Sequence, residues 1–294
     1  MHLTVMKREA VEALNIHPSD VIVDATLGSG GHGEAILKKL DEHGTLIALD
    51  VDSSATEAAE KLLRGTATVR IVNRNFRELG DVLQELGIPE VDGILADLGW
   101  RMEQFSGSGK GFSFKVDEEL LMTYGNPGEY TCTARDIVND WDERDIANVL
   151  KGYGEERFSR RIAERIVRTR QETPIETSGQ LADIVSAAVP AFRRRGKTHP
   201  ATQTFQALRI AANDELGALT DFLETAVTHL ASGGRLAIIT FHSIEDRIVK
   251  QTFRSLQDKE KGTVITKKPM TSTDEEIRDN PRARSAKLRI FEKS

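Results

Sequence analysis

The feature that most constrains the fold is a short apolar run, residues 21–24, that ends in an acid and is followed by glycines. Residues 21–23 are β-branched, whereas residues 34–40 carry apolar side chains at helical spacing, so the hydrophobic period changes across the glycines. Glycines at 28, 30, 31 and 33 allow a sharp turn and a close approach of the backbone to a bound group. The free N–H groups that open the next helix favour a polar or anionic partner. The stretch therefore predicts a strand, a tight turn and a helix start that bind a ligand.

A second acid, Asp50, ends the next apolar run, residues 45–50. An acid about 20 residues beyond such glycines can accept hydrogen bonds from ribose hydroxyls, which predicts an adenosine-type cofactor. Residues 28–33 also fit the dinucleotide fingerprint, so NAD is one alternative. Asp24 favours S-adenosylmethionine instead, because a carboxylate just before the glycines attracts the ammonium group of the methionine end and repels a pyrophosphate.

Strands and helices alternate up to residue 97, with strands expected at 21–23, 45–50, 68–73 and 91–97. This order is typical of an α/β, Rossmann-like fold with a mostly parallel, doubly wound sheet, in which ligands gather at the carboxyl ends of the strands. Asp97 ends the fourth strand. Phe76 closely follows the third, where an aromatic ring either lies against an adenine or belongs to the core.

The alternation stops after residue 98, and the pattern from 133 to 191 is helical. We expect three parts: residues 1–115 as the first part of a methyltransferase-like core, 116–198 as an inserted all-helical substrate-binding domain, and 199–294 as the second part of the core. In this last part, a long helix over 205–229 should stop at 232–234. A strand over 235–241 and a final edge strand over 287–291 should follow. Ser243 is expected to cap the intervening helix.

The 294-residue chain has ordinary hydrophobic content, no apolar run of membrane-spanning length and no signal-peptide pattern at its start. Its single cysteine, Cys132, lacks the neighbours of a zinc site and is expected to be structural. We therefore expect a soluble cytoplasmic protein without a metal site or a disulfide.

Positive charge is concentrated in residues 157–209, which hold eleven Lys/Arg against four Asp/Glu in a chain of net charge −6. Five arginines between 157 and 168 recur at three- and four-residue spacing, and 193–197 adds a basic loop. A solvated helix face is one explanation, but the charge imbalance favours a surface that faces RNA phosphates. The candidate RNA-binding residues are Arg160, Arg161, Arg165, Arg193, Arg194, Arg195 and Lys197.

Five separate motifs, in order, resemble the MraW (RsmH) methyltransferase family over nearly the whole chain. They are DATLGSGGH at 24–32, YGEERF at 153–158, HPAT at 199–202 with FQALRI at 205–210, FHSIEDRIV at 241–249, and NPRARS at 280–285. The resemblance implies S-adenosylmethionine-dependent methylation of the exocyclic N4 amine of a cytosine in 16S ribosomal RNA, with that RNA or the small ribosomal subunit as the partner. By position, it implies cofactor binding by Gly30, Gly31, His32, Asp50, Phe76, Asp97 and Gln104. Asp97 is also the candidate catalytic acceptor for the amine, with cofactor positioning as the alternative.

Two stretches depart from the family pattern. Trp100, Arg101 and Met102 stand where the family has a valine and small hydroxyl residues, and residues 118–125 lack the family's acid–arginine set. Both stretches are expected beside the substrate base, whereas the cofactor motifs are kept. The sequence therefore leaves three hypotheses: an active cytosine methyltransferase, an RNA-binding relative with changed or lost activity, and an NAD-dependent enzyme.

Overall fold

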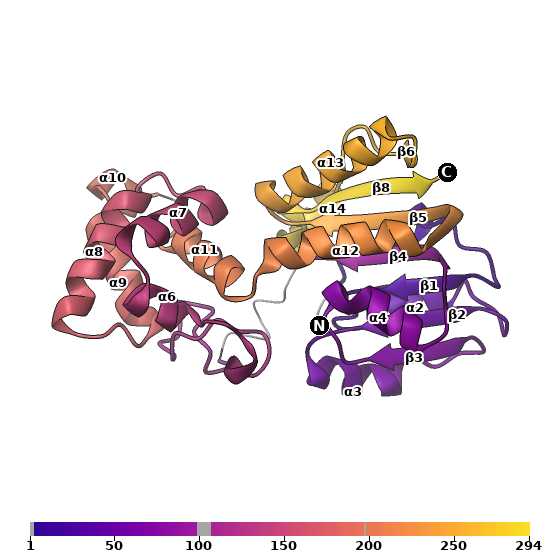
Figure 1. The fold of residues 1–294 in the computed structure, drawn as a ribbon, viewed down its shortest axis with the longest axis horizontal. Coiled ribbons are helices and arrows are strands. Elements are labelled where there is room, and N and C mark those ends of the chain that lie inside the picture. Colours follow the sequence, from indigo (N-terminus) through magenta and orange to yellow (C-terminus); the bar gives the residue numbers. More distant parts are fainter. Residues whose placement is uncertain (1–2, 99–106, 197) are drawn as a thin grey trace. The chain divides into compact units, whose positions relative to one another are not determined.

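A computed structural model describes residues 3–98, 107–196 and 198–294, and the chain divides into two compact units (Figure 1). The first unit combines residues 1–99 with 216–294, and the second is continuous from 100 to 215. The second unit extends beyond the predicted insertion, 116–198, at both ends. The C-terminal extension is the helix α11, Thr202–Ala212, which packs against α7, Glu143–Gly154.

The first unit is built on a mostly parallel sheet whose strand order, among the described residues, is β3-β2-β1-β4-β5-β8-β6, with β7 also paired to β8 (Figure 1). β3, β2, β1, β4 and β5 run parallel to their neighbours, whereas β8 is antiparallel to β5, β6 and β7. The bounds are β1 Val21–Asp24, β2 Thr45–Leu49, β3 Thr68–Val72, β4 Val91–Asp97, β5 Leu230–Thr240, β6 Gly262–Val264, β7 Met270–Thr271 and β8 Lys287–Lys293. This topology confirms the predicted Rossmann-like α/β class.

Helices cover both faces of the sheet. Along β2, Leu46 and Ala48 belong to one core with α1, α2 and α3, whereas Ile47 and Leu49 belong to another with α4, α12 and α13. Strands buried on both faces read as continuous apolar runs, which is why they were recognisable in the sequence. The helices are α1 Lys7–Ala13, α2 Gly31–Leu37, α3 Ser53–Leu62, α4 Leu79–Glu85, α12 Glu215–His229, α13 Ser243–Asp258 and α14 Asp274–Asp279, with 3-10 turns η1 Phe76–Glu78 and η3 Pro281–Ser285.

The second unit is helical around a core of its own, which includes Leu150, Ile162 and Leu208. Cys132 packs against this core, and burial raises the pKa of its thiol. Besides α7 and α11, the unit contains η2 Pro127–Glu129, α6 Ala134–Asp140, α8 Ser159–Glu172, α9 Ser178–Ala188 and α10 Ala191–Arg194. In the described part of the chain, no helix is long and apolar enough to cross a membrane.

The C-terminal predictions were wrong in three respects. The expected helix over 205–229 is two helices, α11 and α12, separated where Asn213 donates to the carbonyl of Met122 at 2.6 Å and Asp214 takes a positive φ of 46°. The expected stop at 232–234 lies inside β5, at a register shift against β4, because α12 already ends at His229. The expected edge strand is β8, which lies between β5 and β6, so β6 forms the edge.

Candidate cofactor site at the strand ends

The turn after β1, residues 25–30, is tied to the ends of the neighbouring strands. The hydroxyl of Thr26 accepts a hydrogen bond from the Asp97 amide at 2.6 Å, which joins the turn to β4. The Gly28 amide donates to Oδ2 of Asp50 at 2.7 Å, which joins it to the end of β2. These bonds bring the glycine turn, Asp50 and Asp97 together at the carboxyl ends of the strands, where a parallel sheet of this kind binds its ligands.

Two of the glycines have backbone conformations that favour glycine. Gly28 and Gly30 have positive φ angles of 53° and 78°, and Gly30 is the residue before α2. Gly31 is required for another reason, since a Cβ atom there would lie 1.9 Å from Oγ1 of Thr4. Packing against the protein's own N-terminal segment therefore explains Gly31, whereas the predicted approach to a ligand stays a prediction.

Asp24 is fully buried at the end of β1. Its Oδ1 accepts from the Thr26 amide at 3.3 Å, while Oδ2 has no hydrogen-bond partner among the described residues. Burial raises the pKa of Asp24 to about 7; the Thr26 amide and, to a smaller extent, the Gly33 amide oppose this shift, and the negative charge of Asp50 adds to it. A buried carboxylate with an unpaired oxygen is suited to a cationic ligand group, which would compensate its charge.

His32, on the first turn of α2, is buried and neutral. Burial lowers the pKa of His32 to about 4, and Nε2 lies 3.2 Å from the carbonyl oxygen of Val5. A carbonyl can only accept, so this contact assigns the proton to Nε2 and leaves Nδ1 as an acceptor. Nδ1 lies 4.0 Å from Oδ2 of Asp97, and at neutral pH the two atoms are both acceptors rather than an ion pair.

Asp50 is fixed by two backbone donors, Gly28 to Oδ2 and Asp52 to Oδ1 at 2.9 Å. Each oxygen can accept further hydrogen bonds, because a carboxylate offers about four lone-pair positions. Phe76 follows β3 in η1, is half-buried, and makes an edge contact with Phe222 of α12 at a ring distance of 5.2 Å. This contact is compatible with either role considered for the ring.

Several predicted positions fall outside the described residues: Gln104, Lys197 and the divergent stretch Trp100, Arg101 and Met102. The other divergent stretch, residues 118–125, is described by the structure, and its side chains make contacts within the second unit. Glu118 is buried, and its Oε2 accepts from the Gly111 amide at 2.9 Å. The Tyr124 hydroxyl donates to Glu215 at 2.6 Å.

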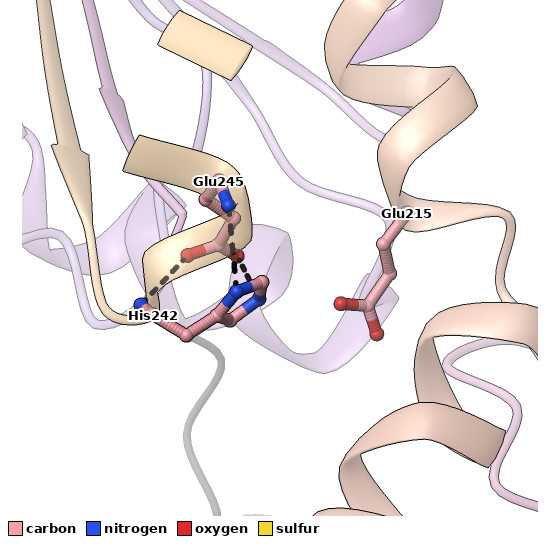
Figure 2. Close-up of side chains that lie close together, drawn as sticks. All are labelled: Glu215, His242 and Glu245. Carbon is pink, nitrogen blue, oxygen red and sulfur yellow. Dashed lines mark hydrogen bonds and ion pairs between the residues drawn. The ribbon is translucent and has the colours of Figure 1, made fainter. Parts of the chain in front are cut away.

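In the turn after β5, a histidine caps the start of α13, whereas the sequence predicted Ser243 as the capping residue. Nδ1 of His242 accepts from the Glu245 amide at 3.4 Å, and Oε2 of Glu245 accepts from the His242 amide (Figure 2). The same oxygen also accepts from the Phe241 amide. His242 is therefore the N-cap and Ser243 is the first residue of α13, so the assignment was wrong. A glutamate three residues after the capping residue is the signal that could have found it. Figure 2 also labels Glu215, the last residue of the second unit.

Of the predicted basic residues of the second unit, Arg160, Arg161 and Arg165 lie on α8, Arg193 and Arg194 lie on α10, and Arg195 directly follows α10. On α8, Arg160 and Arg161 are exposed and Arg165 is half-buried. The starts of the two helices are in contact, because the rings of Phe158 and Phe192 meet edge-on with their centroids 6.2 Å apart. The folded unit therefore brings together two basic stretches that are separate in the sequence.

The MraW methylase family matches residues 1–294. The chain belongs to the MraW methylase family. Three similar relatives are each called ribosomal RNA small subunit methyltransferase H. They come from a Paenibacillus species (45% identical), Brevibacillus brevis (44%) and Heliobacterium modesticaldum (45%), and each match covers 99% of this chain and 98–99% of the relative. This MraW family member is a methyltransferase whose cofactor is S-adenosylmethionine, so the NAD alternative is wrong.

Proposed function

We propose that this MraW family methylase transfers a methyl group from S-adenosylmethionine to the N4 amine of a cytosine in 16S ribosomal RNA, within the small subunit or its RNA. The observation that carries the proposal is the full-length identity, 45% over 99% of both chains, with a protein named for methylating the RNA of that subunit. Two features of the structure also support it: buried Asp24 suits a cationic cofactor group, and the basic helical surface of the second unit suits RNA phosphates.

The residues at the strand ends fit the cofactor. When bound, S-adenosylmethionine supplies a methyl group activated by a sulfonium. We assign Asp24 to the ammonium group, because its unpaired buried oxygen needs a positive partner. Asp50 accepts from the ribose hydroxyls. The remaining proposed cofactor residues are Gly30, Gly31, His32, Phe76, Asp97 and Gln104.

Asp97 is the proposed acceptor for the substrate amine. The lone pair of an exocyclic amine is delocalised into its ring, so a carboxylate that accepts one N–H hydrogen bond helps to direct the lone pair towards the methyl donor. The Thr26 hydroxyl holds the Asp97 amide, and neutral His32 lies 4.0 Å from the carboxylate without competing as an ion-pair partner.

The proposed RNA surface comprises Arg160, Arg161, Arg165, Arg193, Arg194, Arg195 and Lys197. Among the described residues, none of Arg160, Arg161, Arg165, Arg193, Arg194 and Arg195 forms an ion pair, whereas Arg135 pairs with Glu119 and Arg209 with Glu215. Cations without acidic partners are available to displace counter-ions from a phosphate backbone.

The direct test is methyl transfer from labelled cofactor to a fragment of small-subunit RNA, followed by mass mapping of the modified base. We expect label on the N4 of one cytosine, and loss of cofactor binding with Asp50→Ala. The alternative, a relative with changed or lost activity, is favoured by the engagement of Glu118 and Tyr124 in internal contacts where the family has its acid–arginine set. Cofactor binding without methylation of that RNA would support the alternative.

A further inference from the structure

Phe192 is an apolar side chain in an unusual place. It lies on α10, and with 68% of its surface exposed it is the most exposed large apolar residue of the described part of the chain. A single exposed ring is too small for a stable protein interface, which requires a contiguous patch. A single ring is, however, large enough to contact a ligand that offers one flat apolar surface at a time.

The ring is held on one side. Phe158, at the start of α8, meets it edge-on with an angle of 65° between the ring planes, and Phe158 itself packs against the core of the second unit. An aromatic ring has few rotatable bonds, so one edge contact with a core side chain orients it at little entropic cost. Phe192 is thus an oriented ring whose larger part stays accessible.

The surroundings of this ring are positive. Arg194 and Arg195 follow it and are exposed, and Arg157 precedes Phe158 and is also exposed. Arg193 is directed by a 2.8 Å hydrogen bond to Oε1 of Gln203. Within the described residues none of these arginines forms an ion pair. An aromatic ring among unpaired cations matches the two requirements of single-stranded nucleic acid, stacking of a base and neutralisation of phosphates.

We propose that Phe192 is a stacking platform for an unpaired base of the RNA substrate, with the arginines of α10 and the start of α8 contacting the adjoining phosphates. The inference rests on the proposed function and specifies its substrate, because only an unpaired base exposes a face to the ring. Duplex RNA would contact the same arginines but not the ring.

The test compares the full-length protein and its Phe192→Ala variant on two oligonucleotides: a single-stranded RNA containing cytosines, and the same backbone with abasic sites. On the first, we expect the variant to bind on the order of tenfold more weakly, with an unchanged slope of log K against log salt. On the abasic backbone, both proteins should bind equally. Arg194→Gln should weaken binding to both oligonucleotides and reduce the salt slope.

Val116→Ala is the matched control, since Val116 is a 46% exposed apolar residue of the same unit that precedes an acid. It should bind like the wild type, and Phe192→Trp should retain affinity. Equal binding of wild type and Phe192→Ala to the base-bearing RNA would overturn the stacking role, as would an equal loss on the abasic backbone. Absence of RNA binding by the wild type would overturn the proposed RNA surface as well. Phe192-dependent binding to anionic phospholipid vesicles, without base-dependent RNA binding, would replace RNA with a membrane.

Discussion

Among single residues, Asp24 gives the clearest prediction of how cofactor binding depends on pH. Its pKa of about 7 means that the folded, cofactor-free protein holds a proton on this carboxyl group below neutrality. A cationic ligand group favours the ionised carboxylate, so we expect affinity for S-adenosylmethionine to rise as pH increases through about 7 and then to level off. Calorimetry across this range should also detect proton release on binding.

Asp24→Asn provides the control for this profile. The variant should bind more weakly above pH 7 and lose the rise, because its amide does not titrate. A wild-type profile that stays flat from about pH 6 to about pH 8 would contradict the assignment of Asp24 to the ammonium group.

The same carboxyl group should limit the stability of the cofactor-free fold. The folded pKa lies above 3.8, the ordinary pKa of an aspartate in an unfolded chain, so the native state binds the proton more tightly than the unfolded state does. The free energy of unfolding should therefore fall as pH rises from about 4 to about 7, by up to about 4 kcal/mol, and then stay level. Asp24→Asn should remove this fall.

Denaturant unfolding of both proteins at about pH 5 and about pH 8 measures the effect. The difference in stability between the variant and the wild type should be larger at the higher pH. If this difference is the same at both values, Asp24 is ionised in the native state throughout that range.

At the level of elements, substitutions on α8 should change electrostatic RNA binding without changing cofactor binding. Charge reversal of Arg160, Arg161 and Arg165 should weaken RNA binding and flatten its salt dependence, because each phosphate contact contributes about one unit to the slope. Cofactor affinity should not change. Filter binding at several salt concentrations gives the slope, and calorimetry gives the cofactor affinity.

A matched reversal at exposed Lys250 and Arg254 of α13 and at exposed Lys259, which directly follows α13, changes the net charge by the same amount without touching the proposed surface. It should reduce RNA binding much less than the α8 reversal does. Similar losses from the two triple variants would show that net charge, rather than the α8 arginines, governs binding.

The elements that the sequence predicted well are those with continuous apolar runs ending in an acid. β1, β2 and β4 were recognisable because both faces are buried, and this placed Asp24, Asp50 and Asp97 at the strand ends. Two-residue and three-residue strands carry no detectable period, so β6 and β7 were missed and β8 was misplaced as an edge. The break before α12 depends on side-chain bonds of Asn213 across the chain, which spacing does not encode.

The candidate site was predictable in position but not in electrostatics. Strand-end acids follow from topology alone. The raised pKa of Asp24 and the neutral state of His32 depend on how completely packing excludes water, and that is a property of the tertiary structure. Glycine at 31 was expected to face a ligand, yet the closest neighbour of an added side chain is Thr4.

For the molecule as a whole, the separation of the cores predicts where the cofactor acts. The clusters around the sheet contain only first-unit residues, and the helical cluster contains only second-unit residues. A cofactor at the strand ends should therefore slow amide hydrogen exchange in residues 21–32 and 45–50, while the buried amides of α7 and α11 keep their rates. Exchange measured by mass spectrometry with and without cofactor checks this.

Residues 68–72 of β3, at the sheet edge, serve as an internal comparison within the first unit. Protection of the second unit's core equal to that at the strand ends would mean that the two units share one opening event.

The placement of the second unit inside a single crossover of the sheet has a consequence for folding kinetics. β4 and β5 are neighbours, with Gly93 opposite Arg235, yet all of residues 100–215 lie between them in the chain. Closing so long an unstructured loop is slow, whereas a loop already condensed around its own core has its ends much nearer together. The second unit is synthesised before β5 and has a hydrophobic core made of its own residues. Core substitutions on α7 or α8, far from the cofactor in sequence, should therefore delay the assembly of a sheet to which they contribute no strand.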